Sequence, residues 1–282
     1  MIATLLHDPT VEGLDMALYL DGSGSMDDEY EYQSGGFFAW LFGRNTKKQN
    51  VVEPQARWIL EYLATKDRNG LLRAAYWACG SGGNYIEVIG EMQGKDVATY
   101  TFPGPEKSGG GTQLVPAIDD FVAYIREQAK AGAKRGCAVF ITDGAIQDAV
   151  RVQERCDAIV DEIRRGALPK LNFVLVGVGS GVDEEQMEEI CHEEYEGIGH
   201  LWCHRVATEI ENTAELVAVL VDETMTVAAG GTIYDDAGTV LKRYEGRLPA
   251  VLEFGVPDSA RSFTLVIGAE RYEQPIPAEE DH

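Results

Sequence analysis

Basic residues are scarce in this chain. Lys and Arg together number 24 among 282 residues, against 47 Asp and Glu, and the formal net charge is −23. Nucleic-acid binding needs clustered Lys and Arg to neutralise phosphates, and anionic membrane surfaces attract the same residues. The composition therefore argues against nucleic-acid and membrane partners, and predicts an acidic protein that attracts cations.

Long apolar runs are missing as well, and none approaches the roughly 20 residues that a transmembrane helix needs. The opening stretch, MIATLLHDPTVEG, has no basic region ahead of an apolar one, so we expect no signal peptide. The five cysteines are odd in number and lack a framework spacing, which favours reduced thiols in a cytosol. We expect a cytoplasmic protein of bacterial or archaeal type.

Short apolar runs are present and indicate buried strands. MALYL at 16–20, AVFI at 138–141 and FVLV at 173–176 are each bounded by polar residues or glycine. Such runs are typical of a parallel sheet covered by helices on both faces. Leu71–Cys79 and Tyr85–Ile89 flank the turn-like CGSGGN, and this arrangement predicts a hairpin.

Amphipathic segments alternate with these runs. Leu114–Ala131 carries a single apolar stripe, and Asp148–Arg165 repeats that pattern before Gly166, a helix stop. Further candidate helices are Val52–Ala64, Asp183–Tyr195 and Asn212–Met225. Strands alternating with helices predict an α/β fold with a doubly wound, mostly parallel sheet flanked by helices.

The pattern of the sequence changes from alternating strands and helices to strands alone after about Ala228. The segments GGTIYDDAGTVLKRYEGRLPAVLEF and SFTLVIGAERYEQPI are β-rich, are separated by turn signals, and show no helical period. We therefore expect an α/β domain at 1–228 with an insertion at about 27–50. A small antiparallel β appendage should occupy 229–277, and residues 278–282 should form a disordered tail.

The most informative stretch is ALYLDGSGSM, at positions 17–26. Here a buried strand runs directly into Asp21, Ser23 and Ser25, which are spaced by glycines that let the backbone turn tightly. In open α/β sheets, ligands bind beyond the carboxyl ends of strands, and Mg²⁺ prefers oxygen ligands. Taken alone, the stretch is equally consistent with a turn whose Asp caps the next helix.

Two further segments strengthen the metal-site interpretation. Thr112 ends the loop SGGGT just before a helix, and Asp143 follows another apolar strand in ITDG. Both should lie at the same sheet edge as the first motif. A single divalent cation could then be surrounded by five oxygen-bearing residues: Asp21, Ser23, Ser25, Thr112 and Asp143.

The order and approximate spacing of DxSxS, GGGT and TDG resemble the metal-ion-dependent adhesion site of the von Willebrand factor A domain, over roughly residues 14–227. The resemblance implies that Ser23, Ser25 and Thr112 ligate Mg²⁺ through their hydroxyls, with Mn²⁺ or Ca²⁺ as alternatives. It also implies that Asp21 and Asp143 bind mainly through water or as hydrogen-bond acceptors, with direct binding in some conformations.

Neutral hydroxyl ligands leave the ion much of its positive charge and an open position, which attracts an outside carboxylate. The expected function is thus a metal-dependent protein-interaction module whose protein partner supplies an Asp or Glu, and not an enzyme. Intracellular bacterial members of the family often act beside AAA+ ATPases or in stress-response clusters, including those linked to tellurite resistance, so the resemblance implies a similar setting.

Other functions remain open on the sequence. A phosphatase-like hydrolase could use the same ion as a Lewis acid, although no general base stands out beyond the ligand acids themselves. The metal site could also be vestigial in a structural subunit. The apolar FFAWLFGR at 37–44 could serve as a partner-docking lid, but a loop that folds onto its own helices is the favoured interpretation.

Three look-alike motifs are less convincing. GVGSGV at 177–182 resembles a dinucleotide loop but ends in Val182, where glycine or alanine is needed. DGSGS resembles a phosphatase loop with an aspartyl nucleophile, but Ser23 stands where a second acid should be. A zinc site is conceivable at Cys191, His192, His200, Cys203 and His204. Their spacing fits no common zinc motif, and buried cysteines with surface histidines are expected instead.

Overall fold

The computed structural model describes residues 2–4, 13–30, 50–179, 181–207, 209, 212–224, 226–249, 251–257 and 259–276. Most of the expected insertion at 27–50, including FFAWLFGR, lies outside these ranges, as do Ser180 of GVGSGV and the expected tail at 278–282. The chain divides into two compact units. One comprises Pro9–Leu220, and the other combines Met1–Asp8 with Val221–His282.

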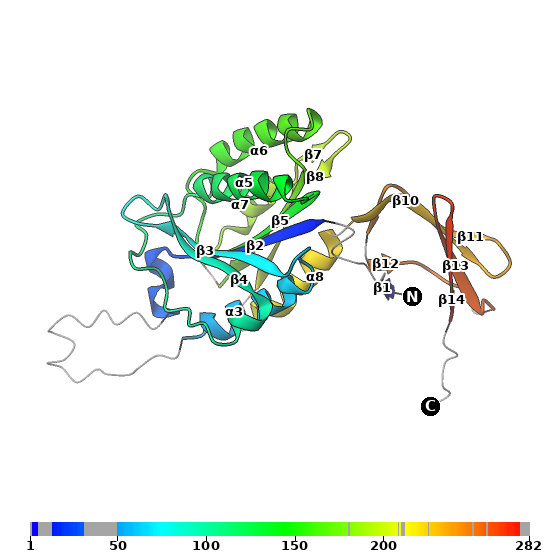
Figure 1. The fold of residues 1–282 in the computed structure, drawn as a ribbon, viewed down its shortest axis with the longest axis horizontal. Helices are drawn as coiled ribbons and strands as arrows, with labels where there is room; N and C mark the ends of the chain where they lie inside the picture. Colours follow the sequence, from blue (N-terminus) through cyan, green and yellow to red (C-terminus); the bar gives the residue numbers. More distant parts are fainter. Residues whose placement is uncertain are drawn as a thin grey trace, which may run out of the picture. The chain divides into compact units, whose positions relative to one another are not determined.

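The larger unit is built on a six-stranded sheet in the order β4-β3-β2-β5-β6-β9 (Figure 1). The strands are β2 (Leu14–Asp21), β3 (Leu71–Cys79), β4 (Tyr85–Gln93), β5 (Arg135–Thr142), β6 (Lys170–Val178) and β9 (Trp202–Ala207). All neighbours pair in parallel except β3 and β4, which are antiparallel. The predicted mostly parallel sheet and the predicted hairpin are therefore confirmed.

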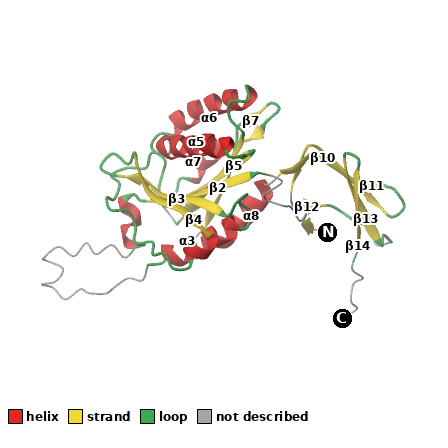
Figure 2. Ribbon diagram, viewed as in Figure 1, coloured by secondary structure: helices red, strands yellow, loops and turns green. Residues whose placement is uncertain are grey.

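Helices cover both faces of this sheet (Figure 2). On one face lie α3 (Val52–Ala64) and α8 (Thr213–Thr224), and on the other lie α5 (Val115–Lys130), α6 (Ala149–Arg164) and α7 (Glu184–Cys191). Two short helices complete this unit: the 3-10 helix η1 (Gly24–Asp28) and α4 (Gly94–Val97). None of the described helices is both long and apolar enough to cross a membrane.

One predicted helix is shorter than expected. The segment predicted as Asp183–Tyr195 is helical only to Cys191, and β7 (Glu194–Tyr195) then pairs with β8 (Gly199–His200). Gly197, between these strands, has a φ of 78°, a conformation that glycine adopts without a steric penalty. The helix ends early because the chain turns back on itself at this point.

The central strand β2 is buried along all eight of its residues, as expected for a strand covered on both faces. An aromatic cluster packs beside it: the ring centroids of Tyr19 and Phe140 are 5.0 Å apart, and those of Phe173 and Trp202 are 4.6 Å apart. Close packing of this kind leaves β2 little freedom to shift. The residues just beyond its carboxyl end therefore extend from a rigid base.

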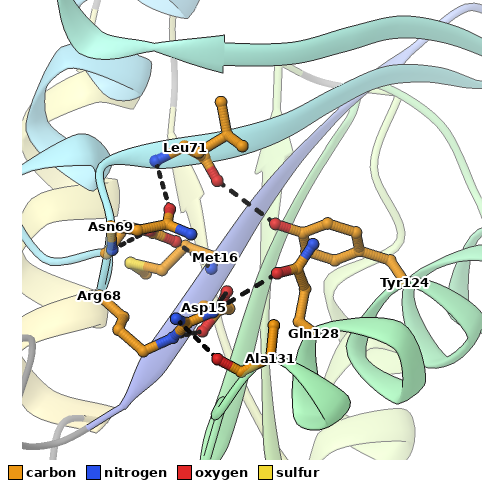
Figure 3. Close-up of polar contacts among 9 residues, drawn as sticks. Asp15, Met16, Arg68, Asn69, Leu71, Tyr124, Gln128 and Ala131 are labelled. Atoms are coloured by element: carbon orange, nitrogen blue, oxygen red, sulfur yellow. Dashed lines mark hydrogen bonds and ion pairs between the residues drawn. The ribbon is translucent and has the colours of Figure 1, made fainter.

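A polar cluster fixes the opposite end of β2 (Figure 3). Asp15 is fully buried, and its carboxylate accepts two hydrogen bonds from the Arg68 guanidinium, at 2.8 and 2.9 Å. Arg68 also donates to the carbonyl oxygen of Ala131, just after α5. Next to this pair, the Asp67 carboxylate accepts hydrogen bonds from the backbone amides of Met16 and Asn69. These contacts join β2 to the segment that follows α3 and to the end of α5.

The smaller unit is an antiparallel β structure, as the sequence predicts. A four-stranded sheet has the order β11-β10-β13-β14, with β10 (Thr226–Asp235), β11 (Val240–Pro249), β13 (Ser262–Ile267) and β14 (Glu270–Pro275). Its core contains Phe254 and Phe263, with ring centroids 5.0 Å apart.

The N-terminal residues differ from expectation. The expected α/β domain begins at residue 1. In the structure β1 (Ile2–Thr4) pairs antiparallel with β12 (Val251–Glu253), so the first eight residues group with the C-terminal unit. This pairing joins residues about 250 positions apart, and no local sequence signal predicts it.

We expect Arg68→Met to lower the free energy of unfolding by roughly 3 kcal/mol, because it leaves the buried Asp15 carboxylate without its partner. Urea denaturation measures this change. As a control, Lys130→Met removes an ion pair with Glu127 in which both side chains are about 70% exposed, and it should cost less than about 1 kcal/mol. Equal losses in the two variants would contradict a structural role for the buried pair.

Stability should also depend on pH through Asp67. Burial raises the pKa of this carboxyl from 3.8 to about 6, and the negative charge of Asp15 adds to the rise. The folded state therefore binds the proton more tightly than the unfolded state. The resulting stabilisation is complete below pH 3.8 and is lost as the pH rises to about 6, and it amounts to at most about 3 kcal/mol. Urea denaturation across this range should show a weaker pH dependence for Asp67→Asn, and an unchanged dependence would contradict the assignment.

Candidate metal centre

The candidate site lies where β2 and β5 end side by side. The two strands pair in parallel with Leu20 opposite Ile141, so Asp21 and Asp143 follow at the same edge of the sheet. The loop containing Thr112 joins them through backbone contacts. Ser23 forms a parallel bridge with Gly109, the amide of Gly24 donates to the carbonyl of Gly109, and the amide of Gly109 donates to the carbonyl of Gly22.

Side-chain contacts link four of the predicted residues. Ser23 Oγ lies 3.0 Å from Ser25 Oγ, and Ser25 Oγ donates a 2.8 Å hydrogen bond to Asp143 Oδ1. Asp21 Oδ1 accepts a hydrogen bond from the backbone amide of Ser23, at 2.7 Å.

Thr112 stands at the same place. It is buried, and its carbonyl oxygen accepts a 2.8 Å hydrogen bond from the amide of Gln147. A Cβ atom added to Gly144 would lie 3.8 Å from Thr112 Oγ1, which puts this hydroxyl beside the residue that follows Asp143. The structure thus brings all five predicted residues to one sheet edge, and their assignment as metal ligands stays a prediction.

The oxygen spacings fit the coordination shell of a small divalent cation. Adjacent ligands of an octahedral Mg²⁺ are about 3.0 Å apart, because Mg–O bonds of about 2.1 Å meet at right angles. The distances of 3.0 Å between Ser23 Oγ and Ser25 Oγ, and of 2.8 Å between Ser25 Oγ and Asp143 Oδ1, match this edge. Hydroxyl and carboxylate oxygens are also the donor types that Mg²⁺ prefers. The residues present therefore fit such an ion.

The electrostatics point the same way. Burial raises the pKa of Asp21 to about 6, against the opposing effect of hydrogen bonds from Thr142 and Ser23, and the charge of Asp143 adds to the rise. Burial likewise raises the pKa of Asp143. In the described part of the chain, no Lys, Arg or His forms an ion pair with either carboxylate. A bound cation would stabilise the charged form of both groups.

The glycines of SGGGT are explained by close packing. A Cβ atom on Gly109 would lie 1.6 Å from the carbonyl oxygen of Ala78, and one on Gly110 would lie 2.4 Å from the carbonyl oxygen of Ser81. Ala78 itself has a φ of 56°, a left-handed conformation found at no other described residue except glycines. The loop bearing Thr112 therefore packs directly on the backbone at the end of β3 and in the β3–β4 turn, and side chains at Gly109 and Gly110 would push it away.

Thr142 is a site residue that is absent from the sequence-based prediction. Its hydroxyl donates a 2.6 Å hydrogen bond to Asp21 Oδ2, so each oxygen of this carboxylate accepts one bond. The available signal was its position at the end of an apolar strand, directly before Asp143. Tyr30 was missed too: its hydroxyl donates to the carbonyl oxygen of Asp21, at 2.8 Å.

Asp148 plays a role that its sequence position does not suggest. It precedes α6 but makes no side-chain cap for that helix. Its two carboxylate oxygens instead accept hydrogen bonds from the amides of Leu114 and Val115, at the start of α5. Asp148 thus ties the segment after Asp143 to the segment after Thr112, which holds two parts of the site in register.

The zinc alternative gains no support from the structure. Cys191 is buried, while His192 and His200 are exposed, with their Nδ1 atoms against the carbonyl oxygens of Glu189 and Glu193. Over the ranges that the structure describes, no group of three or more His, Cys, Asp or Glu side chains lies close enough to hold a metal ion.

No family model matches the sequence, and no curated protein does. Among solved structures, the crystal structure of manganese-loaded Plasmodium vivax TRAP protein is similar to this chain. The two are 13% identical over 98% of this chain and 97% of that one, with a TM-score of 0.46. Likeness at this level carries no argument about family, ligand or partner. Any inference about these must come from the residues of this chain.

We expect Thr142→Val to lower the free energy of unfolding by about 1–3 kcal/mol, because one oxygen of the fully buried Asp21 loses its donor. Thr142→Ser keeps the hydroxyl and serves as the control. Urea denaturation of both variants measures the difference. If the valine variant were as stable as the serine variant, the Thr142–Asp21 bond would contribute nothing to the site.

Proposed function

We propose that this chain is a metal-dependent protein-interaction module of the von Willebrand factor A type. Ser23, Ser25 and Thr112 would bind Mg²⁺ through hydroxyls, with Asp21 and Asp143 as supporting acceptors. The observation that carries the proposal is the position of Ser25 Oγ, which lies at octahedral-edge distance from Ser23 Oγ while it donates a hydrogen bond to the acceptor Asp143 Oδ1.

Exposure of the site favours a ligand that arrives from outside. Asp21, Ser23 and Thr112 are buried, whereas Ser25 is exposed and Asp143 is partly exposed. An ion bound here would be enclosed by protein on the side of the buried residues and open to solvent on the side of Ser25. Because most of the proposed protein ligands are neutral, the ion would retain charge for the carboxylate of a partner's Asp or Glu.

The chemistry available to the site favours binding over catalysis. The groups that hydrogen-bond to Asp21 and Asp143 are hydroxyls and a backbone amide, and none of them is a general base. A metal-dependent hydrolase remains the second candidate, with the ion as a Lewis acid. A cytoplasmic setting, beside an AAA+ ATPase or within a stress-response complex, is a further proposal that follows from the motif resemblance.

Metal binding provides the first test. Titration calorimetry with MgCl₂ should show binding to the wild-type protein and a loss of roughly tenfold or more in affinity for Ser25→Ala and Asp143→Ala. These positions are better choices than Asp21, which is fully buried and hydrogen-bonded through both oxygens, so that its removal would disturb the loop itself.

Asp119→Ala is the matched control, because it removes an exposed carboxylate that pairs with Arg155 on the helical layer. It should bind Mg²⁺ as the wild type does. Undiminished binding by Asp143→Ala would contradict the site assignment. Turnover of p-nitrophenyl phosphate that needs Mg²⁺ and disappears in Asp143→Ala would favour the hydrolase instead.

A further inference from the structure

A surface cavity adjoins the candidate metal centre. Its volume is about 530 Å³, and its walls come from the segment 146–151, from Gln113 after the SGGGT loop and from Gln186 on α7. Cavities of this size accommodate several side chains. Val150 on its wall is 76% exposed, the highest value among the large hydrophobic residues of the described ranges. The cavity is therefore open at the surface, which suits a segment of a protein chain.

The wall of the cavity is linked to the metal centre at two points. Gln113 directly follows Thr112 in the chain, and Gln147, also on the wall, donates its amide to the carbonyl oxygen of Thr112. The side chain of Gln147 lies against Gly111, where a Cβ atom would be 2.4 Å from Gln147 Oε1. The cavity wall and the loop that bears Thr112 are therefore in direct contact.

Hydrogen bonds hold most polar groups of the cavity wall in place. Gln186 bonds to both the amide and the carbonyl of Ile146, and Gln113 donates to the carbonyl oxygen of Gly82. Asp148, the acid on the wall, is buried, and both of its carboxylate oxygens accept backbone hydrogen bonds from α5. These side chains shape the cavity but have limited capacity left for a ligand.

Arg151 differs from these residues. It is exposed on the cavity wall, and within the described part of the chain it takes part in no ion pair. Several other arginines of this unit are committed: Arg68, Arg73 and Arg155 each pair with an aspartate. In a chain with a net charge of −23, an arginine without an acidic partner beside a proposed cation site marks a place for an anionic group.

We propose that the partner presents a segment with two acidic side chains. One carboxylate completes the coordination shell of the metal ion, and the second pairs with Arg151. An apolar side chain of the same partner segment covers Val150. This inference rests on the proposed function, since the first contact needs the ion. It adds the requirement for a second acid, and it makes Arg151 the residue that selects such segments over those with one acid.

The test uses fluorescein-labelled synthetic peptides in a Gly-Ser background. One peptide carries a single Asp, and the others carry a second Asp one to six residues away, each with a Leu between or beside the acids. Anisotropy titrations in MgCl₂ should show roughly tenfold tighter binding of the wild-type protein to two-acid peptides at one spacing. Arg151→Gln should abolish this advantage and leave single-acid binding unchanged.

Arg165→Gln is the matched control, because it makes the same charge change just after the far end of α6. It should keep the two-acid advantage. If wild-type protein binds all peptides equally, or if Arg151→Gln keeps the preference, the inference is wrong. In that case, the proposed function would still stand if peptide binding is lost in the Asp143→Ala variant and is also lost when Mg²⁺ is left out. Absence of Mg²⁺ binding by calorimetry would overturn both.

Discussion

The buried carboxylate of Asp21 is the group on which the candidate site depends. It is fully removed from solvent and hydrogen-bonded through both oxygens, to the Ser23 amide on its own loop and to Thr142 at the end of β5. One side chain therefore sets the turn of the DGSGS loop and joins two parallel strands. Without these donors a buried carboxylate would be costly, so the loop conformation and the strand pairing stabilise each other.

The rest of the unit supports this arrangement from below. The Asp15–Arg68 pair fixes the opposite end of β2, and the aromatic residues beside the strand prevent it from sliding. Above the sheet, Asp148 links the starts of α5 and α6 through the amides of Leu114 and Val115. Rigid strands thus hold the loops whose Ser23 and Ser25 hydroxyls are spaced as in a small cation's coordination shell, while Ser25 stays exposed to solvent.

Much of the fold could be predicted from local pattern. Continuous apolar runs such as 16–20 and 138–141 signal strands covered on both faces, and the stripe of 114–131 signals a helix on one face. The end of α7 and the β1–β12 pairing escaped prediction for different reasons. The first depends on a small hairpin beyond the helix, and the second joins segments at opposite ends of the chain, where local periodicity carries no information.

The sequence by itself determined which oxygen-bearing residues stand next to strands and helices, because each of the three motifs directly follows a recognisable strand or precedes a recognisable helix. Only the tertiary structure decided how they meet. The parallel register of β2 and β5 puts Ser25 within 2.8 Å of Asp143, and close backbone packing at Gly109 seats the Thr112 loop. The tertiary structure also revealed Thr142 and Asp148 as residues that support the site. Their roles arise from contacts between segments distant in the chain, which sequence spacing cannot express.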